Sequence, residues 1–271
     1  KEAIPTGNVP YVFEKREVPS SFLINFWENF GMLIIVSTLF GGIRSLEWIS
    51  MKVKVKYLPH AIVIGVRAVI QNFFLAQLYS VFGDVLLFSI LEFRSSNFDS
   101  SWSRFSFTSS LILFGVMLTL LVFHILLLRN YQKVKITSST NPEILSQFVN
   151  KNKGSFVLFN DFKDYSFLRQ SFLLLLTARD IIFSLLLVTM FYHPLIESIS
   201  ILCLNIAMVV YLILKPPFKS VFDATQQLFY EVIALAVNVS ILIMAIMDEI
   251  GSTGKDLRIS IGKFIIAINM C

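Results

Sequence analysis

The chain has 271 residues, of which 55% are hydrophobic and 15% are charged, well below the roughly 25% charged residues of a soluble domain. Its mean hydropathy is +0.72. This composition excludes a disordered or low-complexity chain and indicates an integral membrane protein. The net charge of +5 comes from residues that lie between apolar runs rather than on one basic soluble face, so no nucleic-acid partner is expected.

Apolar runs of membrane-spanning length follow one another along the chain. A bilayer core of about 30 Å needs roughly 20 apolar residues in a helix. We expect six spans, at residues 22–49, 61–93, 107–128, 167–192, 194–214 and 222–247, and the start of a seventh near Leu257. The runs are too continuously apolar for the alternating strands of an outer-membrane barrel. The predicted fold is all-α, a polytopic transmembrane helical bundle of six full spans plus the start of a seventh.

Lysine and arginine predict how the spans are oriented. Connections at 44–56, 129–169 and 215–219 carry more of these residues than the opposite side does. The more basic side usually faces the cytoplasm, so we expect the N-terminus outside. Residues 1–20 are then an extracellular juxtamembrane stalk, 21–128 membrane helices one to three, 129–166 a cytoplasmic linker, and 167–271 membrane helices four to seven. Because the chain begins at Lys1 and ends at Cys271 within an apolar run, we expect a piece of a longer protein.

The linker is predicted to contain short amphipathic helices. Asn141 is suited to cap a helix that has Pro142 at its first position, and Gly154 is suited to end it. After Gly154, phenylalanines alternate with acids and lysines, which is typical of a segment on the membrane surface. We favour a plain linker over a regulatory or lipid-binding element.

Polar side chains recur at helical spacing within three spans that run in the same direction. The stripes are Gln77, Ser80 and Asp84 in the second span, Thr177, Asp180 and Ser184 in the fourth, and Gln227, Glu231 and Asn238 in the sixth. They imply a shared interior from which lipid is excluded. The predicted intramembrane polar network comprises Arg67, Gln71, Gln77, Asp84, Arg179, Asp180, Glu231 and Asn238.

Depth along the spans suggests partners within this network. Arg67 and Glu231 lie at similar depths, so we expect them to pair, and Arg179 near the midplane is expected to reach Glu231 or Asn238. Arg179 and Asp180 are expected to serve different partners, because helix neighbours point about 100° apart. Three interpretations stay open: structural fastening of the helices, which we favour, an ion or proton pathway, and a bound lipid or small ligand.

Motifs of soluble-enzyme chemistry do not occur. The sequence has no G-x-x-x-x-G-K-[ST], H-E-x-x-H or G-x-S-x-G. Its two cysteines lie in apolar segments, and its three histidines are widely separated. We therefore predict no enzymatic activity, no catalytic residue, no metal site and no cofactor.

Several short stretches resemble those of one family. They are "FWENFG" at 26–31, "GSFVLFNDFK" at 154–163, "ARDIIF" at 178–183, "YHPLIE" at 192–197, "YLILKPPFK" at 211–219 and "LFYE" at 228–231. Together they are similar to the C-terminal membrane region of large cysteine-rich surface proteins of ciliates, a region similar in turn to TRP-like membrane domains. The resemblance implies a long extracellular part joined to the outer end of the first helix, and a role in cell recognition, mating included.

Three functions are compatible with these features of the sequence. The first is a membrane anchor and signalling module for a surface recognition protein, in the plasma or ciliary membrane, with the N-terminus extracellular. The second is a TRP-like cation channel with its pore loop at 248–258 and with Asp248 and Glu249 at the outer mouth. The third is a structural helical subunit of an energy-converting complex. The expected partners are the lipid bilayer and other membrane or surface proteins, in a homo- or hetero-oligomer.

Overall fold

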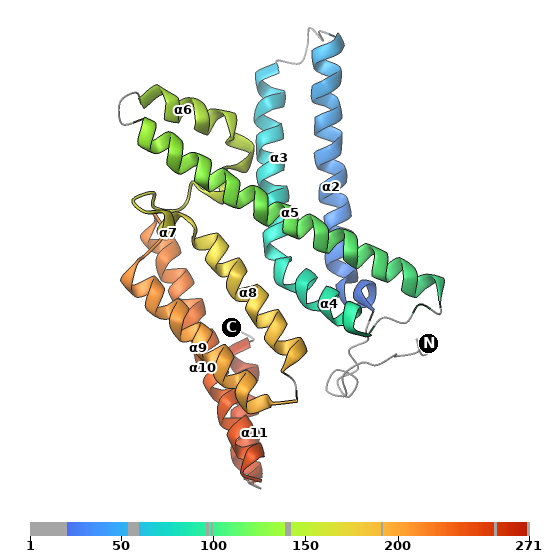
Figure 1. The fold of residues 1–271 in the computed structure, drawn as a ribbon, viewed down its shortest axis with the longest axis vertical. Coiled ribbons are helices and arrows are strands. Elements are labelled where there is room, and N and C mark those ends of the chain that lie inside the picture. The colour runs from blue at the N-terminus through green and yellow to red at the C-terminus, as the bar shows by residue number, and fades with distance from the viewer. Residues whose placement is uncertain are drawn as a thin grey trace. The chain divides into compact units, whose positions relative to one another are not determined.

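The structure is a computed structural model that describes residues 21–53, 60–95, 98, 100–138, 142–190, 192–251 and 254–269. The predicted stalk, residues 1–20, lies outside this range. The helices are α2 (Phe22–Val53), α3 (His60–Ser80), α4 (Phe82–Ser95), α5 (Ser101–Thr137), α6 (Pro142–Lys151), the 3₁₀ helix η1 (Lys153–Leu158), α7 (Phe167–Gln170), α8 (Phe172–Thr189), α9 (Pro194–Leu214), α10 (Val221–Glu249) and α11 (Lys255–Asn269) (Figure 1). Within the described residues there is no β-strand, which confirms the all-α fold class.

Six helices are long and apolar enough to cross a membrane. They are Phe22–Ile49, Ile62–Ser80, Ser101–Thr137, Phe172–Thr189, Pro194–Leu214 and Val221–Glu249. The predicted span at 194–214 coincides with α9, and the one at 222–247 lies within α10. Helix α11 has 15 described residues, fewer than a full span needs, so the seventh span stays a prediction.

Two predicted spans are interrupted, which corrects the sequence prediction. The run at 61–93 forms two helices that meet at a turn at Val81, and the run at 167–192 breaks at Ser171. A serine stands at each break: the Ser80 hydroxyl donates to Gln77 O at 2.8 Å, and the Ser171 hydroxyl donates to Leu168 O at 3.1 Å. Such side-chain bonds compete with the backbone ladder and bend helices, an effect that hydropathy does not reveal.

The chain divides into two compact units. The first comprises Lys1–Asp161 and Leu173–Asp180, and the second comprises Phe162–Phe172 and Ile181–Cys271. Helix α8 therefore contributes residues to both. Each unit has its own packing.

In the first unit, α2 runs antiparallel to α3 and then to α4. The rings of Phe40 and Phe74 stack at 5.4 Å near the middle of α2. Helix α5 runs antiparallel to α4, where Phe93 packs edge-on against Phe107 and Phe114. Figure 1 shows α2 and α3 side by side, with α5 crossing both. The polar groups described below lie along these contacts.

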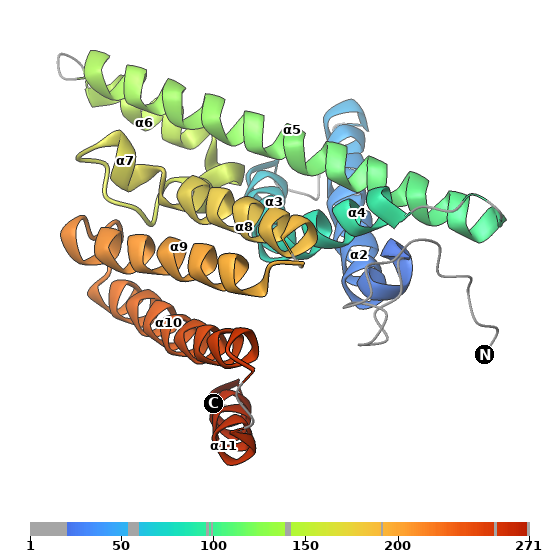
Figure 2. The ribbon, with the colours of Figure 1, turned by 60° about the horizontal axis from the view of Figure 1, so that its bottom comes forward.

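In the second unit, α9 and α10 form an antiparallel helical hairpin, seen side by side in Figure 2. An aromatic cluster of Phe162, Phe172, Tyr211 and Phe218 closes the end of this hairpin where α9 stops. The ring centroids of Phe172 and Phe218 lie 5.0 Å apart, and Phe172 stacks on Tyr211 at 6.0 Å. This cluster fixes the segment before α8 against the turn between α9 and α10.

Candidate functional site

A buried polar cluster holds the first turn of α2. The carboxyl group of Glu92, on α4, accepts a hydrogen bond from Phe22 N at 2.5 Å and another from the Ser106 hydroxyl at 3.1 Å. Ser106, on α5, accepts from Leu23 N at 3.2 Å. The first N–H groups of any helix lack partners within that helix. Here two other helices supply the acceptors, so α2 is capped by α4 and α5.

Sequence reasoning missed this cluster. Glu92 is only 3% exposed, and Ser106 is fully buried. Glu92 stands at the end of an apolar run, and the next helix begins with the serine-rich stretch "SSWSRFSFTSS". The signal in the sequence that could have indicated this cluster is an acidic residue at the end of a predicted span, followed by a helix that begins with several serines.

Two further polar pairs join α2 to its antiparallel partners. Asn29 Nδ2 donates to Asp84 Oδ2 at 3.0 Å, and Arg67 forms an ion pair with Glu47 at 2.7 Å. Glu47 also contacts Arg44 at 3.3 Å. The structure gives Arg67 a partner that the sequence did not predict, Glu47, and the expected contact with Glu231 stays a prediction. The antiparallel register of α2 and α3 brings positions 47 and 67 together, which depth along single spans does not reveal.

The 3₁₀ helix η1 docks on the middle of α3. Asn72 donates to Lys153 O at 2.8 Å and accepts from Val157 N at 3.0 Å, so one amide side chain holds both ends of the segment. Gln71, a predicted network residue, lies 3.5 Å from the Ser155 hydroxyl. A Cβ on Gly154 would overlap the Gln71 amide, so glycine allows this close approach.

His124 attaches η1 to α5 and α3. The imidazole is fully buried, with Nδ1 2.5 Å from the Tyr79 hydroxyl and Nε2 3.1 Å from Leu158 O. A carbonyl oxygen only accepts, so Nε2 carries the proton, and Nδ1 accepts from the tyrosine. The segment expected as plain linker is therefore in part a packed element, with Gly154, Ser155 and Leu158 buried.

The predicted stripe of Gln77, Ser80 and Asp84 is not one helical face. Ser80 ends α3 and Asp84 lies in α4, beyond the turn at Val81. Asp84 instead bonds to Asn29, as described above, and Gln77 is half-buried on α3. The turn thus redirects the polar residues that follow it toward α2.

Arg179 and Asp180 contact each other, contrary to the prediction that they serve different partners. Both Nε and Nη2 of Arg179 donate to Asp180 Oδ1, at 3.3 and 3.2 Å. The separation of about 100° describes where side chains leave the helix, whereas the flexible arginine folds sideways to its neighbour. The Cβ of Asp180 lies 3.8 Å from where a Cβ on Gly83 would stand, so the pair lies beside the α3–α4 turn. The expected contact of Arg179 with Glu231 or Asn238 stays a prediction.

In the second unit, the predicted polar residues of α10 bond along the helix or to the next one. Glu231 is 2% exposed and accepts from Gln227 Nε2 at 3.0 Å, one turn away. Asn238 is half-buried two turns further on. Asp248 forms an ion pair with Arg258 of α11 at 2.5 Å, while Glu249 is exposed at the end of α10. Arg258 therefore neutralises one of the two acids expected at a pore mouth.

The chain matches no protein-family model, and no curated protein or solved structure with which it was compared matches it either. Fold and site nevertheless define a class. The protein is an α-helical integral membrane protein with six candidate spans, and in its first unit polar side chains bond one helix to another.

Proposed function

We propose that this chain is the membrane-embedded module that anchors a large extracellular recognition or adhesion protein, TRP-like in fold, joined on the N-terminal side of α2. The observation that supports the proposal is the buried, capped start of α2. Phe22, Leu23 and Phe26 are fully buried, and the first two donate their backbone N–H groups to Glu92 and Ser106.

This arrangement is suited to bear a load. Lipid tails are as apolar as leucine, so apolar packing alone gives helices little reason to stay together in a bilayer, and interhelical hydrogen bonds contribute more. Tension applied ahead of Ser21 reaches Glu92 of α4 and Ser106 of α5 directly through Phe22 and Leu23. Three helices then resist extraction in place of one.

The proposal includes a sidedness and a location. An extracellular N-terminus agrees with the excess of lysine and arginine in the connections expected to face the cytoplasm, and the proposed location is the plasma or ciliary membrane. The resemblance to ciliate surface proteins supports a role in cell recognition, with other membrane or surface proteins as partners.

The test uses the full-length protein, with an epitope tag inserted ahead of Ser21 and expressed in cells. We expect the tag to react with antibody on intact cells and to stay with the membrane after alkaline carbonate washing. In mild detergent, more of the tagged protein should leave the membrane fraction in Glu92→Ala than in the parent. Glu28→Ala, which replaces an exposed acid on α2, should not change that amount. A tag that reacts only after permeabilisation contradicts the proposed orientation, and unchanged retention in Glu92→Ala contradicts the role of the cap.

A cation channel is the second candidate, favoured by Glu249, which is exposed at the end of the candidate span α10 next to the ion pair of Asp248 with Arg258. Currents from the reconstituted full-length protein test it, with Glu249→Gln as the informative variant. Cation currents that Glu249→Gln reduces support conduction, and silent bilayers with verified insertion favour the anchor.

A further inference from the structure

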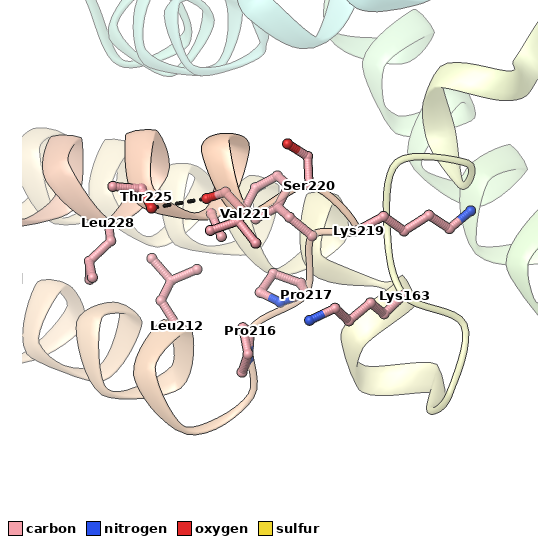
Figure 3. A pocket seen from close by; sticks show the side chains of 11 residues that line it. Lys163, Leu212, Pro216, Pro217, Lys219, Ser220, Val221, Thr225 and Leu228 are labelled. Atoms are coloured by element: carbon pink, nitrogen blue, oxygen red, sulfur yellow. Dashed lines mark hydrogen bonds between the residues drawn. The ribbon is translucent and has the colours of Figure 1, made fainter.

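A partly open cavity of about 290 Å³ lies at the turn between α9 and α10 (Figure 3). Its walls are mostly apolar, with Leu212 on α9, Leu228 on α10, and Pro216 and Pro217 in the turn. Lys163, from the segment ahead of α7, also lines it. The cavity therefore combines apolar walls with a lysine side chain, and both lie within the second unit.

The backbone of Lys163 is held in place. Lys163 N donates to Pro217 O at 2.6 Å, and its neighbour Phe162 forms a β-bridge with Phe218. The aromatic cluster described above packs behind this bridge. Figure 3 shows the Lys163 side chain extending toward the prolines of the turn, whereas Lys219 points away from the cavity. Both lysines line the cavity, and Lys163 is the one whose side chain extends along the prolines.

The cavity lies at the level of the membrane surface. Residues 215–220 join two candidate spans, Pro194–Leu214 and Val221–Glu249, so this turn marks where the chain leaves the bilayer. Leu214 is 70% exposed and Val221 is 82% exposed, and each adjoins or lies near a lysine of the turn. Apolar side chains that face outward beside lysines are typical of a helix end where lipid tails meet headgroups.

We propose that this cavity binds one phospholipid with an anionic headgroup. The phosphate contacts the Lys163 ammonium, and the upper part of one acyl chain lies along Leu212 and Leu228. Charge complementarity favours this occupant, since the described residues that line the cavity include two lysines, Lys163 and Lys219, and no acidic residue. At about 290 Å³ the cavity is at the small end of ligand sites, which start at about 300 Å³, so the rest of the lipid stays in the bilayer.

The test measures lipid retention by the full-length protein. Protein purified from nanodiscs that contain equal amounts of phosphatidylserine and phosphatidylcholine is analysed by native mass spectrometry for bound lipid. We expect phosphatidylserine to be retained preferentially. Lys163→Gln should lower that preference about fivefold, the factor that one lysine near an anionic surface supplies. The variant keeps the backbone bond to Pro217, so helical content and elution should match the parent.

Matched variants separate the cavity from the basic turn around it. Lys215→Gln removes an exposed lysine of the same turn that does not line the cavity, and it should leave the preference unchanged. Ala224→Phe fills the apolar part and should reduce retention of both lipids. Equal preference in the parent and Lys163→Gln, or equal losses in Lys163→Gln and Lys215→Gln, overturns the proposal. Displacement of the lipid by millimolar inorganic phosphate also overturns it, because the site then recognises a free ion.

Discussion

The two units use polar side chains in different ways. In the first unit, Glu92, Asp84, Arg67 and His124 all bond to a residue of another helix or to η1, across long stretches of sequence. In the second unit, the Tyr211 hydroxyl donates to Leu168 O, but Glu231 bonds to a residue one turn away on α10 and Asp248 pairs with the helix that follows. Long-range polar bonds specify which helices are neighbours in lipid. We therefore expect the first unit to depend on its polar residues much more than the second does.

The cap on α2 should give the largest effect. Glu92→Ala leaves Phe22 N without its acceptor and removes one of the hydrogen-bond partners of the Ser106 hydroxyl, and an unsatisfied buried group costs about 1–3 kcal/mol. A loss of about 3 kcal/mol lowers the thermal midpoint by roughly 5 to 10 °C. Size-exclusion profiles of the heated, detergent-solubilised protein measure it. A midpoint within a degree of the parent's would mean that the cap does not hold the unit together.

Disrupting the docking of η1 on α3 should give the second-largest loss of stability. Gly154→Ala places a methyl group against the Gln71 amide, and overpacking of this kind typically costs 1–3 kcal/mol. We expect faster hydrogen exchange at 153–158, with partial rescue in the double variant Gly154→Ala, Gln71→Ala. Gly65→Ala serves as the control, since a Cβ there meets nothing within 4 Å. If both glycine variants exchange at the parent's rate, η1 is not packed on α3 as described.

The ion pair between α2 and α3 should contribute a smaller amount. Arg67→Met removes the partner of a nearly buried carboxyl group, and interhelical polar bonds in membranes average about 0.6 kcal/mol with a maximum near 1.7. A double-mutant cycle of Arg67→Met with Glu47→Gln, scored by thermal midpoint, measures the coupling. A coupling energy near zero would mean that this pair contributes as little to stability as an exposed surface ion pair, despite the burial of Glu47.

Removing the hydrogen bond within α10 should lower the stability least. Gln227→Ala removes a pair four residues apart on one helix, which contributes about 0.2–0.5 kcal/mol. We expect a shift of the thermal midpoint of about 1 °C or less. A loss as large as that of Glu92→Ala would erase the difference between the two units, because α10 would then also depend on its polar residues.

The sequence predicted the existence and class of the helices well, and their polar partners poorly. The span at 194–214 matches α9 because an apolar run between Pro194 and Lys215 has clear ends. The partner of Arg67 depends on the register of two antiparallel helices, which hydropathy does not encode. Helix geometry alone predicted that Arg179 would not contact Asp180. The flexible arginine side chain nevertheless reaches its neighbour and donates to its carboxyl group. Asn72, next to the predicted Gln71, was missed although it makes the better bonds to η1.

Helix α5 is longer than any bilayer requires. Its 37 residues extend about 55 Å, against a hydrocarbon core of about 30 Å. His124 attaches this helix to η1. Ser106 of the α2 cap lies toward one end of the helix, and Tyr131 lies toward the other, where Phe148 of α6 packs at 6.0 Å. One continuous helix therefore carries the attachments of α2, η1 and α6.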